Sequence, residues 1–404
     1  MFRRIIKYCL KHFGLFEKLA YVTDRRIKPQ IETIKIAAAI VCIHIANLGS
    51  LNSFSQSKAS KSKLPSVSTI ARVADTIELE GIRAAGSSIY RKARKSRIIS
   101  PYFGTWTGIV DAHEITTSKY CKCSHCKRRK LKTKDKSIKY QYYHSFTAFI
   151  LAGDKYSFVL DIEPIAPGES EVTSSYRLIK RVCASYPRAF KVLIGDALYL
   201  NEKIFKLLES HHKKAIAVLK EERRQLFEEA NKLSLLTKFK IYEDSKTTYR
   251  IWDHTIGGCW DGYGKDVRVI VTEETTRQRV LAKDGSRWEQ QSVITNWMWV
   301  TNIMDSSLGD LKNTVRICHC RWQIENKCFN ETAGTWKADH IYRHSKNAII
   351  AFLLLLFICV NIFNIFCARN IKDKKIKTKV YLVAQIKAEF YSLKRPLALV
   401  PIPI

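Results

Sequence analysis

The sequence predicts a mixed α/β fold, in which helices flank a sheet of parallel and antiparallel strands. Three strand patterns stand together after about residue 105, and helix and strand patterns then alternate as far as about residue 237. Residues 238–302 break this alternation with strand-like, turn-rich sequence that holds five of the eight tryptophans. The chain has 404 residues, 46% of them hydrophobic, which is enough for two or three units with a substantial core.

Residues 1–104 are predicted to form a helical, basic module that binds DNA. A polar break over residues 53–66 divides it. We expect Ser68 to cap one long helix after this break, because apolar residues follow at helical spacing. That helix ends in RKARKSR, which contains Arg91 and Arg94. Such a run is often only a solvated helix end, but the charge of the whole chain favours contact with nucleic acid.

Residues 105–237 are predicted to form the first part of the core. TWTGIVDAHEI and YYHSFTAFILAG are strand candidates, and a tight turn at residues 153–155 leads to a third strand, YSFVLDIEPI. An amphipathic helix is expected over residues 171–185. FKVLIGDALY then has the continuous apolar run of a buried parallel strand, and EKIFKLLESHH, KAIAVLK and RRQLFEEANKL continue as helix, strand and helix.

The remaining residues divide into three predicted parts. Residues 238–302 form a β-rich insertion, and residues 303–371 complete the core with helices. Within the latter, residues 348–368 are long and apolar enough to cross a membrane, but a core helix buried on all sides has the same pattern, and we favour that interpretation. Residues 372–404 are predicted to be a basic, loosely held C-terminal tail.

Charge and cysteine usage limit the class of protein. Lysine and arginine number 69 against 37 aspartates and glutamates, which gives a formal net charge of +32. This surplus indicates a polyanionic partner, either nucleic acid or an anionic membrane surface. The 12 cysteines lack the spacing of a small disulfide-bonded secreted domain, and no secretory signal opens the sequence. We therefore expect a protein of a reducing cytoplasm.

Two aspartates stand at the ends of predicted strands, Asp111 in GIVD and Asp196 in VLIGD. Alone, each is typical of a turn or of a helix N-cap. Together with Glu325 on a later helix they predict a shared pocket, because ligands bind outside the carboxyl ends of strands in open α/β sheets. Three carboxylates suit two Mg²⁺ ions, or Mn²⁺ in their place, and phosphoryl transfer.

The glutamate lies in RWQIENKCFN, which continues a helical pattern. Positions 318, 321, 325, 328 and 332 are predicted to share one helical face. Arg321, one turn before Glu325, would then hold a DNA phosphate or orient the glutamate. The same spacing is also that of an ordinary surface ion pair.

Several ordered stretches carry a family resemblance. They are GIVDAHEI, YYHSFTAFILAG with LDIEPIAPGESEV, YPRAFKVLIGDALYLNEKIFKLL, AVLKEERRQLFEEA, and RWQIENKCFN with WKADHIYRHS and the apolar helix after it. In these stretches, which cover about residues 105–370, the chain resembles the DDE transposases of bacterial insertion sequences, specifically the insertion-sequence-four family with its ribonuclease-H-like core.

The resemblance implies that Asp111, Asp196 and Glu325 are the catalytic, metal-binding triad. It implies metal-dependent cleavage at transposon ends and strand transfer into target DNA by cut and paste. The partners would be double-stranded DNA with terminal inverted repeats and a second copy of the chain, in the nucleoid of a bacterial cytoplasm.

The family signature on the glutamate helix is tyrosine, arginine, glutamate and lysine, and the chain departs from it twice. Cys318 stands at the tyrosine position and Thr332 at the lysine position. Because these positions normally contact DNA phosphates, the alternative is a catalytically inactive or domesticated DNA-binding relative. A membrane-associated protein that uses residues 348–368 is the second alternative.

Further basic and aromatic residues are candidates for DNA contact. Lys220, Arg223 and Arg224, in VLKEERR, suit phosphate groups, although an exposed helix start has the same composition. The tryptophans of the insertion could stack on a flipped base or could simply form the core of that segment.

The stretch CKCSHC contains Cys121, Cys123 and Cys126 beside His125. These residues could bind a structural Zn²⁺, with a further ligand from elsewhere, although the spacing is not a standard one. The alternative is a basic loop, CKRRKLKTKDK, that touches DNA.

Overall fold

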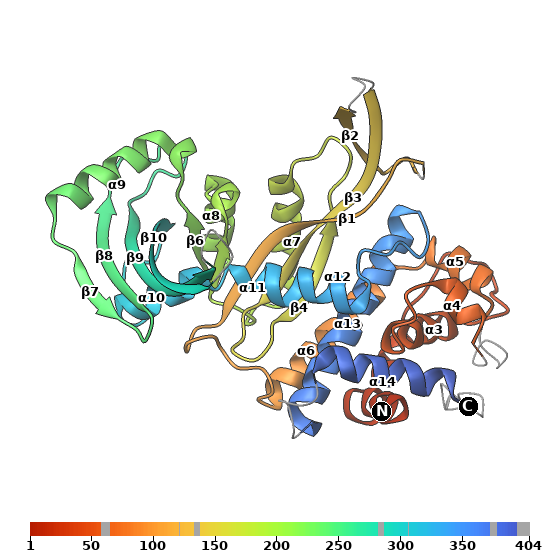
Figure 1. The fold of residues 1–404 in the computed structure, drawn as a ribbon. Helices are drawn as coiled ribbons and strands as arrows, with labels where there is room; N and C mark the ends of the chain where they lie inside the picture. Colours follow the sequence, from red (N-terminus) through yellow and green to blue (C-terminus); the bar gives the residue numbers. More distant parts are fainter. Residues whose placement is uncertain are drawn as a thin grey trace. The chain divides into compact units, whose positions relative to one another are not determined.

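A computed structural model describes residues 1–57, 65–120, 122–132, 138–281, 287–305, 307–371 and 378–393. The chain divides into two compact units. Unit 1 contains Met1–Ser100, Asp111–Tyr186 and Gln323–Ile404, and unit 2 contains Pro101–Val110 and Pro187–Trp322. Figure 1 labels the helices and strands.

The sheet of unit 1 is built on three predicted strands. At its centre, β3 (Ile138–Leu151) pairs antiparallel with β4 (Phe158–Pro164) and lies beside β1 (Thr107–Ser118), which belongs to this unit from Asp111 onward. Helix α7 (Glu171–Ser185) packs on β3 and β4 with its apolar face. These strands and this helix confirm the sequence prediction for the region.

A further strand of this sheet was not predicted. β2 (Lys127–Lys132) pairs antiparallel with the first half of β3. The sequence analysis gave a basic loop, CKRRKLKTKDK, as an alternative here, but its residues 127–132 form a strand. KRRKLK offers little apolar patterning, so the strand depends on its pairing with β3. Arg129 in β2 forms an ion pair with Glu114 of β1 (N–O distance 2.9 Å) and donates a hydrogen bond to Gln141 of β3 at 2.7 Å.

Helix α13 (Lys346–Asn370) forms the centre of the helical part of unit 1. Helices α3 (Thr33–Ile45), α5 (Val67–Ala74) and α6 (Leu79–Lys95) pack against it. Among the described helices, α13 alone is long and apolar enough to cross a membrane, and its apolar window is entirely buried within the protein. That burial fits the core helix favoured from the sequence.

Shorter helices complete unit 1. They are α1 (Phe2–Tyr8), the π-helical turn η1 (Cys9–Phe13), α2 (Leu15–Leu19), α4 (Leu51–Ser55) and α14 (Lys379–Tyr391). Helix α14 packs on α1 and buries a stripe of four apolar side chains, Leu382, Val383, Ile386 and Phe390. The sequence analysis predicted no element here, because the basic character of the segment hid this short stripe.

The helix predicted to start at Ser68 is two helices. Ser66 caps α5 instead, since its hydroxyl accepts a hydrogen bond from the Thr69 N–H at 3.2 Å. Between α5 and α6, the backbone of Ile77 forms a bridge with Asp24. Apolar spacing alone does not reveal this interruption, because it depends on a partner more than fifty residues away.

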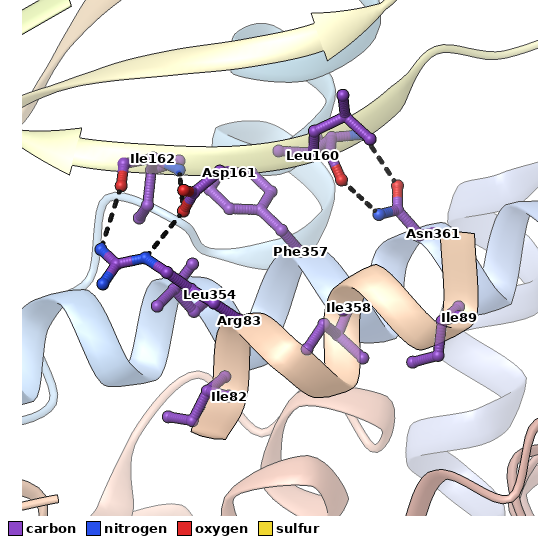
Figure 2. Close-up of a pocket in the computed structure, with 12 residues that line it drawn as sticks. Ile82, Arg83, Ile89, Leu160, Asp161, Ile162, Leu354, Phe357, Ile358 and Asn361 are labelled. Atoms are coloured by element: carbon purple, nitrogen blue, oxygen red, sulfur yellow. Dashed lines mark hydrogen bonds and ion pairs between the residues drawn. The ribbon is translucent and has the colours of Figure 1, made fainter. Parts of the chain in front are cut away.

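A buried carboxylate ties α6 to the sheet (Figure 2). Asp161 in β4 is 3% exposed, and it accepts hydrogen bonds from Arg83 Nε of α6 at 3.1 Å and from Arg181 Nε of α7 at 2.6 Å. Arg83 and Asp161 line a small cavity, which Asn361 of α13 also lines. The Asn361 amide forms two hydrogen bonds with the backbone of Val159, at 3.0 and 2.8 Å. Polar contacts therefore join the N-terminal helices, the sheet and the apolar helix within unit 1.

The strands of unit 2 continue the same ten-stranded sheet. Residues 107–109 of β1 pair parallel with β5 (Val192–Gly195), and β5 pairs parallel with β6 (Lys214–Val218). The β-rich segment continues the sheet antiparallel from β6 in the order β10, β9, β8 and β7. These strands are Trp288–Thr301, Val267–Leu281, Thr247–Ile256 and Lys240–Glu243.

The helices of unit 2 follow the predicted alternation. They are α8 (Glu202–Ser210), α9 (Arg224–Leu236) and α10 (Leu311–His319), with 3-10 turns at Ala197–Tyr199 and Glu221–Arg223. Helix α9 packs on β8 and β9 (Figure 1). The β-rich segment therefore extends the sheet beyond β6, and α9 packs on two of its strands.

The glutamate-bearing segment is not one continuous α-helix. Helix α10 ends at His319, and a short α11 (Trp322–Ile324) leads into the π-helical turn η5 (Glu325–Phe329) and then α12 (Asn330–Trp336). The prediction that positions 318, 321, 325, 328 and 332 share one face was wrong, because the helix breaks after His319 and the π-helical turn changes the angular spacing.

Candidate functional site

Asp111 lies at the point where β1 passes from unit 2 to unit 1, and it is half-buried. Its Oδ1 accepts a hydrogen bond from the Ala112 N–H at 2.9 Å. In the parallel pairing of β1 with β5, Ile109 stands opposite Ile194. Asp111 and Asp196 each stand two residues beyond this last paired position in the sequence.

Asp196 is half-buried and directly follows β5. Its Oδ1 accepts a hydrogen bond from the Leu198 N–H at 2.9 Å, so it caps the 3-10 turn that follows. Gly195 permits this turn, because a Cβ there would lie 2.5 Å from Tyr199. Arg223 supports the same loop by donating from Nη2 to the Leu200 carbonyl at 2.7 Å.

Glu325 begins the π-helical turn of unit 1 and is half-buried. The residues on either side fix its backbone: Gln323 Oε1 accepts from the Gly153 N–H at 3.2 Å, and Lys327 Nζ donates to the Gly153 carbonyl at 2.8 Å. The turn after β3 therefore holds this helical segment from both sides of the glutamate.

A stacked ring pair links this segment to β1. His113 of β1 stacks on Phe329 with ring centroids 4.6 Å apart and an interplanar angle of 18°. His113 is two residues beyond Asp111, on the same face of the strand, and Phe329 is one turn beyond Glu325. The two elements that carry these carboxylates in unit 1 therefore lie against each other.

The basic candidates differ in what surrounds them. Arg321 Cζ lies 4.4 Å from the centroid of the Trp322 ring, and Arg94 Nη1 donates to the Tyr90 hydroxyl at 2.7 Å. Lys220 and Arg91 are exposed. The side chain of Arg224 lies outside the described residues. Contact of any of them with DNA stays a prediction.

The two departures from the family signature are buried. Cys318 is 1% exposed, and burial raises the pKa of its thiol well above the ordinary range. Thr332 is 2% exposed, and its hydroxyl donates to the Cys328 carbonyl at 2.6 Å. Both side chains face the interior, where they cannot touch a phosphate.

The tryptophans of the β-rich segment have several roles. Trp260 and Trp299 are buried in the unit, and Trp297 stacks on Trp299 with centroids 5.9 Å apart. Trp288 is 67% exposed. Two of the five rings are therefore buried in unit 2, Trp252 and Trp297 are half-buried, and Trp288 alone of the five is exposed.

A second polar cluster in unit 1 consists of Cys123, Cys126, His144 and His344, whose ligand atoms all lie within 4.8 Å of one another. We call it the Cys/His cluster. The predicted member Cys121 lies outside the described residues. Burial, and to a lesser degree His344 and His125, lowers the pKa of His144 to about 4, so that its ring is neutral.

The sequence analysis missed both histidines of this cluster. His144 was part of a predicted strand, and His344 was part of the stretch WKADHIYRHS. Their separation from the cysteines, 218 residues between Cys126 and His344, matches no ligand spacing. His125, considered as a ligand beside the cysteines, is exposed and lies 3.0 Å from the Ser124 hydroxyl instead.

The geometry defines a class of protein: a mixed α/β domain with a large mixed sheet, flanking helices, one aspartate within β1 and another directly after the parallel strand β5. Residues 102–362 match the family model described as the transposase DDE domain. The match covers more than half of the chain, which therefore belongs to this family and has its ribonuclease-H-like fold. The chain is a transposase with DNA as its substrate. No curated protein matches it.

Proposed function

We propose that this transposase is a cut-and-paste enzyme of the insertion-sequence-four family, with Asp111, Asp196 and Glu325 as its catalytic carboxylates. The observation that carries the proposal is the parallel register of β1 and β5, in which Ile109 and Ile194 are opposite and each is followed, two residues later, by an aspartate. The stacking of His113 on Phe329 supports Glu325 as the third member.

The three side chains fit hard divalent cations. Each is a half-buried carboxylate, and Mg²⁺ prefers such oxygen ligands while it keeps waters and binds substrate phosphates. When bound, Mg²⁺ or Mn²⁺ would polarise the scissile phosphate and favour deprotonation of the attacking water. Asp111, Asp196 and Glu325 would hold the ions and orient the phosphate between them.

The reaction follows as two displacements. Water attacks the phosphodiester at the element's end, the bond to the 3′ oxygen breaks, and a free 3′-hydroxyl remains. This hydroxyl then attacks a phosphodiester of target DNA, and another 3′-hydroxyl leaves. Basic side chains such as Lys220, Arg321 and Arg91 would neutralise the DNA phosphates. Synapsis of two element ends favours a homodimer on terminal inverted repeats, in the nucleoid of a bacterial cytoplasm.

The test is nicking of DNA that carries the inverted repeats flanking this gene. We expect the purified full chain to release 3′-hydroxyl ends with Mg²⁺ or Mn²⁺ and to do nothing with EDTA. Asp196→Asn should bind the same DNA and lower the nicking rate by roughly 10⁴-fold, about 5.5 kcal/mol in barrier. Asp261→Asn, at an exposed aspartate of the same unit, is the matched control and should nick normally.

The alternative is a DNA-binding relative without catalysis, favoured by Cys318 and Thr332. It predicts repeat-specific binding by the wild-type chain and no nicking with either metal. An unchanged nicking rate in Asp196→Asn would remove this residue from the triad.

A further inference from the structure

The separations within the Cys/His cluster are those of a tetrahedral metal site. The Cys123 and Cys126 sulfurs are 3.7 Å apart, Cys126 Sγ lies 3.3 Å from both His144 Nε2 and His344 Nε2, and Cys123 Sγ lies 3.5 Å from His144 Nε2. The two Nε2 atoms are 3.1 Å apart.

Zinc chemistry predicts these numbers. Zn–S bonds of about 2.3 Å and Zn–N bonds of about 2.0–2.1 Å separate tetrahedral ligand atoms by about 3.8 Å for S–S, about 3.6 Å for S–N and about 3.3 Å for N–N. The five distances given above are each within a few tenths of an ångström of these values, and all four ligand atoms lie within 4.8 Å of one another. Hydrogen bonding among four side chains does not by itself require four atoms to converge on one point.

The ligands come from three separate elements of unit 1. Cys123 and Cys126 bracket a tight turn between β1 and β2, closed by the Cys126 N–H donating to the Cys123 carbonyl at 3.1 Å. The Cys123 N–H donates to Cys126 Sγ at 3.2 Å, a contact that stabilises a thiolate. His144 lies in β3, and His344 lies in the connection from α12 to α13.

The position of His344 is held by its neighbours. Arg343 Nη2 lies 2.8 Å from Asp75 Oδ2, and the Ser345 hydroxyl donates to the other carboxylate oxygen at 2.5 Å. The residues on both sides therefore face Asp75, while His344 faces the cysteines.

We propose that Cys123, Cys126, His144 and His344 form a structural Zn²⁺ site. Four protein ligands complete a tetrahedron and leave no open position for a substrate, which separates this site from the carboxylates. The ion would link the β1–β2 turn and β3 to the connection between α12 and α13, which contains His344. It would thus fix the C-terminal end of the segment that carries Glu325.

The experiment measures metal in the purified full chain. After growth with zinc, we expect one Zn²⁺ per chain by elemental analysis, retained through dialysis. With Co²⁺ in its place, we expect the visible bands of a tetrahedral ion together with near-ultraviolet thiolate-to-cobalt charge transfer. The charge-transfer band identifies sulfur ligands, which the carboxylate site does not have.

Variants assign the ligands. Cys126→Ser combined with His344→Asn should lose the bound zinc and the charge-transfer band. His125→Asn is the matched control, because this exposed imidazole lies in the same turn and outside the cluster, and it should keep both. Asp196→Asn should also keep both.

Two results would overturn the proposal. One is a wild-type chain that binds neither zinc nor cobalt through sulfur. The other is a double variant that still carries one zinc per chain. The cobalt spectrum of the wild-type chain decides the question even if the double variant fails to fold.

Discussion

Asp161 lies within strand β4 and Asp196 directly follows strand β5, and the surroundings of these two carboxylates differ completely. Asp161 is 3% exposed and is matched by the guanidinium groups of Arg83 and Arg181. Asp196 is half-buried and caps a 3-10 turn through one oxygen. Within the described part of the chain, no lysine or arginine forms an ion pair with Asp196 or with Glu325.

We propose that this difference separates acids that stabilise the fold from acids that bind a metal ion. A carboxylate whose charge is already balanced by arginines gains little from a cation and contributes to the fold. A half-buried carboxylate without such a partner keeps lone pairs available for a metal ion. Substitutions at the two kinds of position should therefore affect different measurements: stability for the first, and cation binding and catalysis for the second.

The largest effect on stability is expected for Asp161→Ala. Removing the carboxylate leaves two arginines near a buried cavity, and breaking such a pair costs about 3–5 kcal/mol. We expect about 3 kcal/mol, because Arg83 and Arg181 each keep a second carboxylate partner, Glu80 and Glu163. Urea denaturation of the full chain measures this loss of unfolding free energy.

The control for this change is an exposed ion pair. Glu114→Gln removes the ion-pair partner of Arg129. The Arg129 and Glu114 side chains are 44% and 35% exposed, so the loss of unfolding free energy should stay below about 1 kcal/mol. Equal costs at the two sites would remove the distinction drawn for Asp161.

Gly195→Ala tests the turn that positions Asp196. The added methyl group would lie 2.5 Å from Tyr199, a clash that should cost about 2 kcal/mol and displace the aspartate. We expect a lower midpoint in thermal unfolding together with slower nicking. Gly334→Ala in α12 is the control: its Cβ meets nothing within 4 Å, so helix propensity should stabilise the protein by about 0.5–1 kcal/mol.

Asp24 is another carboxylate paired with an arginine, and its contribution to stability should depend on acid pH. Its side chain is 1% exposed, and hydrogen bonds from Arg26 in the first place, and then from Thr33, lower its pKa from 3.8 to about 2. The unfolded chain therefore binds this proton more readily than the folded one. The contribution, about 2 kcal/mol, is fully present above pH about 4 and is lost as the pH falls towards 2.

The measurement compares unfolding free energies at two pH values. Between pH 6 and 3 the wild-type chain should lose about 1 kcal/mol more than Asp24→Asn, which has no carboxylate to protonate. Parallel pH profiles for the two chains would show that Arg26 does not hold Asp24 in this way.

Much of the fold could be predicted because its signals are local. Strands such as β5 and β6 have continuous apolar runs, and α7 was predicted with its observed bounds, Glu171–Ser185. The aspartates were found because each directly follows such a run. β2 could not be found, since its basic residues become a strand only by pairing with β3.

The Cys/His cluster and the glutamate segment show where local signals end. The spacing of the cysteines is visible in the sequence, but His144 and His344 are brought to them only by the tertiary structure. The break after His319 was hidden because the residues on both sides continue a helical pattern. The Cys/His cluster depends on contacts between distant parts of the chain, which no window of sequence contains.

The smallest effect on stability is expected for Asp196→Asn and Glu325→Gln. Asparagine caps a turn about as well as aspartate, and neither carboxylate has a described ion-pair partner to lose, so each change should stay within about 0.5 kcal/mol. Added Mg²⁺ should raise the thermal midpoint of the wild-type chain, because it binds only the folded form, and should raise it less in either variant. A large loss of stability in the absence of metal would show that these residues stabilise the fold, as Asp161 does. An equal Mg²⁺ shift in all three chains would mean that the ion binds elsewhere.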